Sequence, residues 1–430
     1  MSLNSHSSVQ YEAAPKRVCM IAYTNYSIDG RVRLEAESLV SWGHEVIFLV
    51  AKEGAIPRTY SLRGVTLTEL RVRIYGGKGQ VRYLLSYLTF LVLAFVACTR
   101  LFIQSRVDVI HVHNMPDMLV FAGLLPRLFG RKLILDVHDT VPETYVAKFE
   151  TTSNLIFSIL RLEEWICFCL AHKLICVNHV QRDALIERGV PAEKIITVVT
   201  MPKFMSRKPA SNNHEQAHAF RMVNHGTISK RLGIDLIVKA TAKLVHEIPD
   251  FELHLYGEGD DLENIFSQIE TLGLSRHVHF HGVVPWETLP KELETMDVGI
   301  VANRANVATE LMLPAKLIDY VILDIPAIVP KLQAIQYYFS PDMVSFFEPE
   351  NVDSMVAATV NLYRDNARRE RQRQSAKSFL DKYAWDNRQN ALKHLYSNFV
   401  LVDEPGLTRQ RKSLTTPREL TKEATSRPRL

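Results

Sequence analysis

The sequence lacks both a cysteine framework and a concentrated run of one charge. Its 430 residues contain five cysteines, an odd number that follows no disulfide or zinc-ligand spacing. We therefore expect all five to be reduced thiols packed in the core, which suits a cytoplasmic protein. The net charge is only +4, and the basic residues are not gathered into one patch, which argues against nucleic acid as a partner. A mildly basic chain suits an anionic ligand or an anionic membrane surface.

Long apolar runs are also scarce. Residues 1–15 lack the apolar segment of a signal peptide, and we expect them to form a polar tail. Residues 84–102 are mostly apolar, but the uninterrupted part is too short to favour a membrane span. The basic residues that flank this segment are Lys78, Arg82, Arg100 and Arg106. It fits either a helix buried in an α/β domain or a helix that docks on a bilayer.

Docking would make the protein a peripheral one on the cytoplasmic face of the membrane. Arginine and lysine side chains attract anionic lipids, and an aromatic side chain can insert shallowly at the interface. Under this hypothesis Tyr83, Tyr87 or Phe90 would insert.

Short apolar runs alternate with segments of helical spacing along most of the chain. Runs such as 18–23, 107–114 and 132–139 are typical of buried parallel strands, and the alternation resumes from residue 219. A chain of this length is too long for one core. The pattern predicts an α/β fold with two Rossmann-like parallel-sheet domains that face each other across a cleft. Ligands of such sheets bind at the carboxyl ends of the strands.

The polar stretch at 202–218 has no periodicity and marks the domain boundary. We expect a first domain at 16–203, a linker at 204–218 and a second domain at 219–380. The helical segment 381–402 should pack back across both domains. Residues 403–430 are basic without an apolar face, which predicts a disordered tail.

Residues 225–233, HGTISKRLG, follow a predicted strand and open a helix. Small residues such as Gly226 and Thr227 let the backbone approach a phosphate, and the N–H groups of a helix N-terminus point toward it. Lys230 and Arg231 add positive charge. A tight turn with solvated basic side chains is the alternative interpretation.

Glycines end the next two predicted strands. Gly257, and Gly282 with Val283 after it, could allow a flat base or a sugar to pack closely, although plain turn glycines fit equally well. Asp260 and Asp261 resemble a metal pair, but helix capping explains them better. We expect no metal.

The most informative stretch is 309–330, TELMLPAKLIDYVILDIPAIVP. Lys316 and Asp319 lie three residues apart and so share one face of a helix. A lysine that reaches a diphosphate and a carboxylate that reaches ribose hydroxyls need this geometry. An ion pair on a helix surface is the alternative.

This stretch resembles the nucleotide-sugar motif of family 4 glycosyltransferases of the GT-B fold, in the variant MLP.KL.EY...G.P.V.P. The segment HGTISKRLGIDLIVKA is similar to the phosphate-binding turn of that family, and GEG and HGVVP sit at its expected intervals. In the first half, YTNYSIDGRVRLEAESLVSWGHEV, DVIHVHNMPD and LILDVHDTVPE resemble the acceptor-side domain. Each motif is loose, but all of them in order, from about residue 17 to 399, are specific.

The resemblance implies a glycosyltransferase that retains anomeric configuration and uses a UDP- or GDP-sugar, with no cofactor. The acceptor would be a glycan or a polyprenyl-diphosphate-linked saccharide, as in the synthesis of surface polysaccharides or glycoconjugates. Two protein cations on the diphosphate would make a metal unnecessary. The expected catalytic residues are His113, Arg231 and Lys316. Further donor-site residues are Gly226, Thr227, Lys230, Gly257, Val283, Met312, Leu313 and Asp319. Acceptor-side residues are Asp29, Gly30, Arg31, His138, Asp139 and Glu143.

Three positions depart from the family pattern. Asp319 stands where the family usually has glutamate. Leu311 stands where many members have glutamate, with Glu310 one place away, and Leu232 replaces a lysine before the turn glycine. A nucleotide-sugar epimerase of the same fold and a non-catalytic scaffold remain open alternatives. An epimerase would need an acidic pair that we do not find, and Arg231, Lys316 and Asp319 argue against a scaffold.

Overall fold

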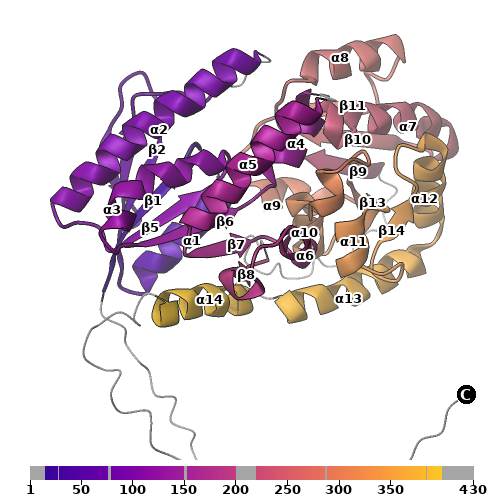
Figure 1. The fold of residues 1–430 in the computed structure, drawn as a ribbon. Coiled ribbons are helices and arrows are strands. Elements are labelled where there is room, and N and C mark those ends of the chain that lie inside the picture. Colours follow the sequence, from indigo (N-terminus) through magenta and orange to yellow (C-terminus); the bar gives the residue numbers. More distant parts are fainter. Residues whose placement is uncertain are drawn as a thin grey trace, which may run out of the picture.

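The computed structural model describes residues 15–27, 29–75, 79–149, 153–199, 219–285, 288–383 and 385–399. The expected linker and C-terminal tail lie outside these ranges, as does the N-terminal tail except for Pro15. The described chain forms two domains, each built on a sheet of mostly parallel strands with helices on both faces (Figure 1). The predicted α/β fold of two parallel-sheet domains is confirmed.

The first domain contains an eight-stranded sheet, sheet A, in the order β3-β4-β2-β1-β5-β6-β7-β8. Its strands are β1 (Arg17–Ala22), β2 (Glu45–Ala51), β3 (Thr59–Leu62), β4 (Val65–Leu70), β5 (Val109–His113), β6 (Lys132–Val137), β7 (Lys173–Cys176) and β8 (Ile195–Thr197). Only β3 runs antiparallel to its neighbour β4. The strand order reverses between β1 and β5, which is where open parallel sheets bind ligands.

Two helical layers cover sheet A. On one face lie α2 (Gln80–Ile103), η1 (Asp117–Gly123), α3 (Leu124–Leu128), α5 (Asn154–Leu170) and α6 (His179–Glu187). The other face carries α1 (Gly30–Ser41). The remaining short helices of this domain are α4 (Val141–Phe149) and η2 (Ala192–Lys194). Side chains alternate between the two faces along each strand, so an apolar run such as β1 supplies both cores.

The second domain contains a six-stranded parallel sheet, sheet B, in the order β11-β10-β9-β12-β13-β14. Its strands are β9 (Phe220–His225), β10 (Phe251–Tyr256), β11 (Val278–Gly282), β12 (Val298–Ile300), β13 (Ala327–Pro330) and β14 (Ser345–Phe347). Its helices are η3 (Lys230–Leu232), α7 (Ile234–Glu247), α8 (Leu262–Thr271), α9 (Leu289–Glu292), η4 (Leu293–Thr295), η5 (Thr309–Leu311), α10 (Ala315–Ile322), α11 (Gln333–Tyr338), α12 (Val352–Arg364) and α13 (Asn366–Tyr383). The order reverses between β9 and β12, so the turn after β9 lies at the switch point.

The C-terminal helices join the two domains. The last turns of α13 pack on the second domain, where Phe379 contacts Tyr338. After them, α14 (Trp385–His394) and η6 (Leu395–Phe399) reach sheet A, and Leu392, Leu395 and Tyr396 enter its core on the α1 face. Figure 1 shows this segment in yellow beneath both domains.

Helix α2 buries one stripe of side chains and exposes most of the others. Tyr87, Phe90, Ala94 and Cys98 pack against sheet A, while Val92 is 61% exposed on the outer side. The expectation that Tyr87 and Phe90 insert into a membrane is therefore wrong, because the sheet already buries them. Among the described residues, α2 is long and apolar enough to cross a membrane by length and composition.

The expectation that every cysteine is a core residue is also wrong at one position. Cys19, Cys98, Cys167 and Cys176 are buried thiols, but Cys169 is exposed. Residues 167 and 169 lie two positions apart on α5, so the helix turns them to different sides.

Leu392 should be important for the attachment of the C-terminal segment. It is 2% exposed in the core of the other domain. We expect Leu392→Ala to lower the free energy of unfolding by about 2–5 kcal/mol, the usual cost of a buried leucine. Chemical denaturation measures this. The neighbouring exposed Lys393→Ala should change stability by less than about 0.5 kcal/mol; equal effects of the two variants would contradict the packing.

Candidate active site

The turn after β9 is built by close contact between backbones. Gly226 has a φ of +99°, and its N–H donates to the carbonyl of Tyr256 at 3.0 Å. A Cβ atom on Gly257 would lie 1.9 Å from the carbonyl oxygen of Gly226. Gly257, predicted as a contact to base or sugar, therefore has a structural explanation of its own: it lets the two turns pack together.

Lys316 and Asp319 project from the first turns of α10 toward this turn. Both side chains are at least nine-tenths buried. The Nζ of Lys316 donates to Oδ1 of Asn224 at 3.2 Å, and Oδ2 of Asp319 lies 3.5 Å from Nε2 of His225. A Cβ on Gly226 would lie 3.8 Å from Cε of Lys316, so the glycine turn and the lysine are neighbours.

Burial sets the protonation of this group. It lowers the pKa of Lys316 to about 8; Asp319 opposes this shift and the nearby charge of Arg231 adds to it. Burial also raises the pKa of Asp319 to about 8, against the pull of Lys316. His225 is neutral at physiological pH, because burial and Lys316 lower its pKa to about 3. The donor side thus holds the desolvated ammonium group of Lys316. Burial also disfavours the ionised form of its neighbour Asp319.

Arg231 adds a second cationic group. Its Nη1 atom is buried and has no hydrogen-bond partner within the described part of the chain. A buried guanidinium N–H without an acceptor costs free energy, which an anionic ligand would recover. Arg231 and Lys316 therefore favour an anion beside the Gly226 turn.

The other predicted donor residues surround this centre unevenly. Thr227 and Lys230 are exposed on the turn, and Val283 is exposed after β11. Met312 and Leu313 directly precede α10. Glu310, next to the position where the family pattern has glutamate, accepts a hydrogen bond from the backbone N–H of Gln333 at 2.6 Å and so caps α11.

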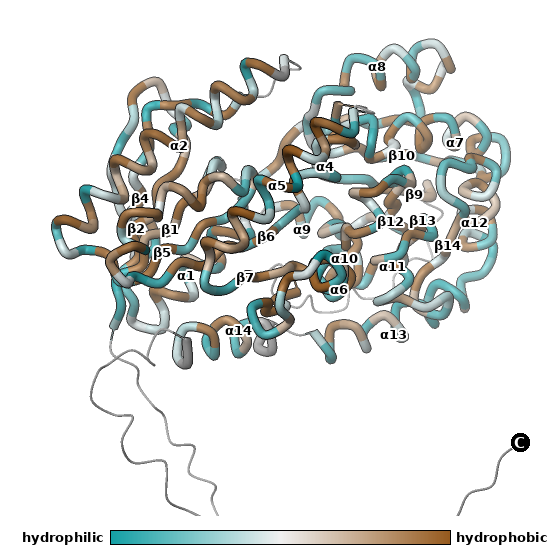
Figure 2. The backbone as a smooth tube through the Cα atoms, viewed as in Figure 1, coloured by the Kyte–Doolittle hydropathy of each residue, from teal (hydrophilic) through white to brown (hydrophobic). Residues whose placement is uncertain are grey.

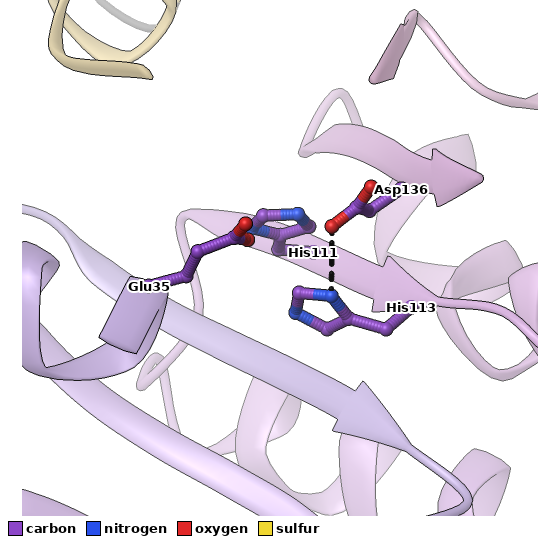
Figure 3. Close-up of side chains that lie close together, drawn as sticks. All are labelled: Glu35, His111, His113 and Asp136. Atoms are coloured by element: carbon purple, nitrogen blue, oxygen red, sulfur yellow. Dashed lines mark hydrogen bonds and ion pairs between the residues drawn. The ribbon is translucent and has the colours of Figure 1, made fainter. Parts of the chain in front are cut away.

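In the first domain, a buried polar cluster lies between sheet A and α1. Figure 3 shows His111 and His113 side by side on β5, Asp136 on the adjacent strand β6, and Glu35 reaching in from α1. The rings of His111 and His113 stack with centroids 4.4 Å apart, and Nδ1 of His113 lies 3.0 Å from Oδ2 of Asp136. The hydroxyl of Tyr396 pairs with Nδ1 of His111 at 2.9 Å. The C-terminal segment therefore reaches this cluster.

Asp136 organises the two predicted histidines. Its Oδ2 also lies 3.0 Å from Nε2 of His138. Burial alone would raise the pKa of Asp136, but His138 and His113 hold it well below the usual range. Burial disfavours the charged form of His138, yet Asp136 outweighs it and raises the pKa of this histidine. His113 is only 1% exposed, so its ring lies inside the domain and does not open to solvent.

Most of the predicted acceptor-side residues come together at this edge of sheet A. Asp29 caps α1, and its Oδ2 accepts from the hydroxyl of Thr24 at 2.9 Å. Gly30 and Arg31 begin α1, and Nε of Arg31 lies 3.8 Å from Oδ1 of Asp29. Burial alone would raise the pKa of Asp29, but the charges of Arg31 and His138 lower it. Asp139 follows His138 directly.

Glu143 lies apart from this group. Its carboxylate is buried and pairs with the guanidinium of Arg188 at 2.8 Å. Arg188 also pairs with Glu164 at 3.2 Å. This ion-pair network explains Glu143 as a structural residue, and its predicted contact with the acceptor has no support in the geometry.

Two residues absent from the prediction support the site, and one of them, Asn178, links its two halves. Asn178, at the end of β7, donates from Nδ2 to the carbonyl of Leu311 at 2.9 Å. Gln181 donates from Nε2 to the carbonyl of His138 at 3.4 Å, and it belongs to none of the sequence motifs. The carboxyl edges of the two sheets thus meet beside Met312 and Leu313. The asparagine that ends the run KLICVN was the available signal, because it stands at the carboxyl end of an apolar run, as His113 does.

Both halves of the chain match models of glycosyltransferase domains. Residues 29–199 match a glycosyl transferase 4-like domain, and residues 209–379 match the glycosyl transferases group 1. The chain is a family 4-like glycosyltransferase of the GT-B type. The recognition made from the sequence motifs is confirmed. No curated protein sequence matches the enzyme.

Solved structures share the fold of this glycosyltransferase. Sucrose-phosphate synthase from Thermosynechococcus elongatus superposes with a TM-score of 0.70 at 16% identity, over 88% of this chain and 98% of that one. HepE from Anabaena, solved with UDP, gives a TM-score of 0.64 at 14% identity over 89% and 99% of the two chains. The catalytic domain of starch synthase IV from Arabidopsis thaliana, bound to ADP and acarbose, gives 0.65 at 12% identity over 90% and 100%.

Two groups of side chains in the described ranges place potential metal ligands within 4.8 Å of one another. They are Glu35 with His111, His113 and Asp136, and Glu252 with His254 and His279. In the first group, Asp136 and His111 already bond to His138 and Tyr396. Neither group contains a residue of the glycosyltransferase donor turn.

Lys316 should matter for activity and not for stability. Its pKa of about 8 in the folded protein is below the ordinary lysine value of 10.5, so below pH 8 its charge costs folding free energy. We expect Lys316→Met to leave the free energy of unfolding unchanged or raised at pH 7, while transfer falls about 100-fold or more. The exposed Lys239→Met serves as control in both measurements. Transfer near the wild-type rate in Lys316→Met would contradict the assignment.

Binding of UDP should weaken as the pH rises through about 8. Both Lys316 and Asp319 have pKa values of about 8, so a higher pH removes a positive charge and adds a negative one. We expect the affinity to fall about tenfold between pH 7 and pH 9 for each of the two groups whose protonated form favours UDP, because the protonated fraction of each group falls about tenfold. Calorimetric titration measures this, with Lys316→Arg as the comparison. Equal pH dependence in the wild type and Lys316→Arg would show that another group is responsible.

Proposed function

We propose that the enzyme transfers a sugar from a nucleoside-diphosphate sugar to a glycan or lipid-linked saccharide, with retention of anomeric configuration and without a metal. One observation carries the donor part of this proposal. A desolvated lysine and a guanidinium with a buried, unpaired N–H lie together beside a glycine turn at the switch point of sheet B. HepE and starch synthase IV, which share the fold, were solved with UDP and ADP, and this supports a nucleotide as the ligand.

The charge of this centre suits the departure of a diphosphate. As the sugar–phosphate bond breaks, negative charge accumulates on the leaving group. Cations and backbone N–H groups that are already in place stabilise that charge without reorganisation, and they do so more strongly in a site from which water is excluded. Lys316 and Arg231 would contact the diphosphate, together with the N–H group of Thr227. Asp319 would hold the ribose, where its higher pKa also lets it donate a hydrogen bond.

The first domain would hold the acceptor and the reacting face of the sugar. Arg31 is exposed at this edge, Asp29 and Asp139 are half-buried, and His138 is buried just beneath them. His113 would act from beneath them, because Asp136 can hold its Nδ1 proton and leave Nε2 as an acceptor. In this arrangement the buried Asp136–His113 pair positions the ring of His138, and the contact from Asn178 to Leu311 keeps the donor loop next to the first domain.

The anomeric configuration and the metal requirement can be tested in one assay. We expect NMR of the fresh product to show the anomeric configuration of the donor, and transfer to continue undiminished in EDTA because protein cations serve the diphosphate. Nucleotide-sugars with UDP and GDP, each tested with lipid-linked and free glycan acceptors, identify the substrates. An inverted anomer would refute retention. Activity that EDTA abolishes and magnesium or manganese restores would refute independence from metal.

A further inference from the structure

The outer side of α2 is a long apolar surface that no other part of the described chain covers. The stripe that faces sheet A is buried, but leucine, valine and phenylalanine side chains on the opposite side are 38–61% exposed. They are Leu84, Leu85, Leu88, Val92, Phe95 and Val96. A helix that is apolar on all sides is normally buried on all sides. The outer side of α2 therefore requires an apolar partner.

Helices α3 and α5 extend this surface. Both α2 and α5 contact η1 and contribute to the same core beneath it, so they lie on one face of sheet A. In Figure 2 hydrophobic colouring continues along α2 and recurs on α5. Trp165 is 60% exposed on α5, and Leu128 and Phe129 are 68% exposed at the end of α3. Leu155, Ile159 and Leu162 continue the exposed stripe of α5.

The charge on this surface is of one sign. In α2, α3 and α5, as the structure describes them, the acidic residues are Glu163 and Glu164 alone. Glu164 is buried and paired with Arg161 and Arg188, and Glu163 is half-buried and accepts from Sγ of Cys167. Arg82 and Arg100 are exposed near the two ends of α2. Apolar and aromatic side chains bordered by cations fit the interface of an anionic bilayer.

A second copy of the chain fits this surface less well. A symmetric dimer would place Arg82 and Arg100 of one copy against the same basic surface of the other, and like charges at an interface disfavour association. A transmembrane arrangement of α2 would also be costly. It would remove Tyr87, Phe90, Ala94 and Cys98 from the core of the first domain, where each is less than a tenth exposed.

The surface lies next to the acceptor side of the site. Tyr23, which follows β1, packs its ring on Tyr87 at 4.9 Å and Phe90 at 5.3 Å, and this anchors the first half of α2 at the edge that holds Asp29. Nearby, the Nζ of Lys148 lies 4.2 Å from the centre of the Tyr83 ring. Lys148 belongs to α4, the helix that follows His138, so one short helix separates the surface from the predicted acceptor residues.

We propose that the outer side of α2, α3 and α5 docks on an anionic lipid bilayer and holds the acceptor edge of sheet A close to the lipid headgroups. The docking itself stands on the exposed surface alone, and its use in presenting a lipid-linked acceptor rests on the proposed function. The apolar side chains enter the interface, Arg82 and Arg100 meet lipid phosphates, and no segment crosses the membrane.

Co-sedimentation of the full chain with vesicles tests this proposal. The vesicles contain phosphatidylcholine with or without phosphatidylglycerol, at low and high salt. We expect binding to the phosphatidylglycerol vesicles that high salt weakens. Leu88→Ser should reduce it, while Leu272→Ser, at a similarly exposed leucine on the second domain, should not (39% against 42% exposed). Arg100→Gln should weaken partition about fivefold, the equivalent of about 1 kcal/mol, while the exposed Arg276→Gln should not.

Three results would overturn the proposal. The first is no binding to anionic vesicles at low salt, or equal losses in the test and control variants. The second is a dimer in solution that Leu88→Ser converts to monomer, since a second copy would then cover the surface. The third is a pellet that resists carbonate, which indicates a spanning helix. Titration with UDP runs in parallel on each variant. Failure to bind UDP with intact vesicle binding would refute the proposed donor and leave docking in place.

Discussion

The desolvated charge of Lys316 is the interaction on which the donor side depends. The lysine sits on α10 beside a turn that requires glycine at two positions. Gly226 has a φ of +99°, and a Cβ on Gly257 would lie 1.9 Å from the carbonyl oxygen of Gly226. Lys316 bonds to Asn224 rather than to an ionised carboxylate. Burial raises the pKa of Asp319 to about 8, so this carboxyl does not fully neutralise the charge of Lys316 at neutral pH. A protein accepts this cost where a ligand supplies the missing negative charge. Arg231, with its buried Nη1, adds to the same unbalanced charge.

The strand order of each sheet determines where the predicted site residues lie. Each sheet reverses its strand order at one point, between β1 and β5 and between β9 and β12, and the predicted residues follow the strands at those points. The C-terminal segment ties the domains together from the other end of the chain, and Tyr396 reaches His111 in the buried cluster. The crossing segment therefore contributes a hydrogen bond to the buried cluster as well as apolar packing to the first domain.

The outer surface of the first domain follows from the same packing. Helix α2 contributes one stripe to the core and leaves the opposite stripe without a protein neighbour in the described ranges. The exposed stripes of α2 and α5 share a face because both pack on η1. One exposed apolar helix by itself does not indicate a membrane-binding surface. The indication comes from the two helices together and from the single sign of the charge that they expose.

The sequence by itself determined the fold class, the family and the positions of the strand ends. Parallel strands buried on both faces read as short apolar runs, and the segments MLPAKLIDY and HGTISK keep their order and spacing whatever the tertiary arrangement. The sequence did not determine which side chains are buried or which residues they contact. Gly257 proved to let two turns pack closely, Glu143 to pair with Arg188, and Tyr87 and Phe90 to be buried on the inner side of α2. Asn178 and Asp136 acquired their importance only from neighbours distant in the chain. Local patterns record the periodicity of one segment, whereas burial, charge balance and hydrogen bonding depend on what the fold places opposite it, and only the tertiary structure decides that.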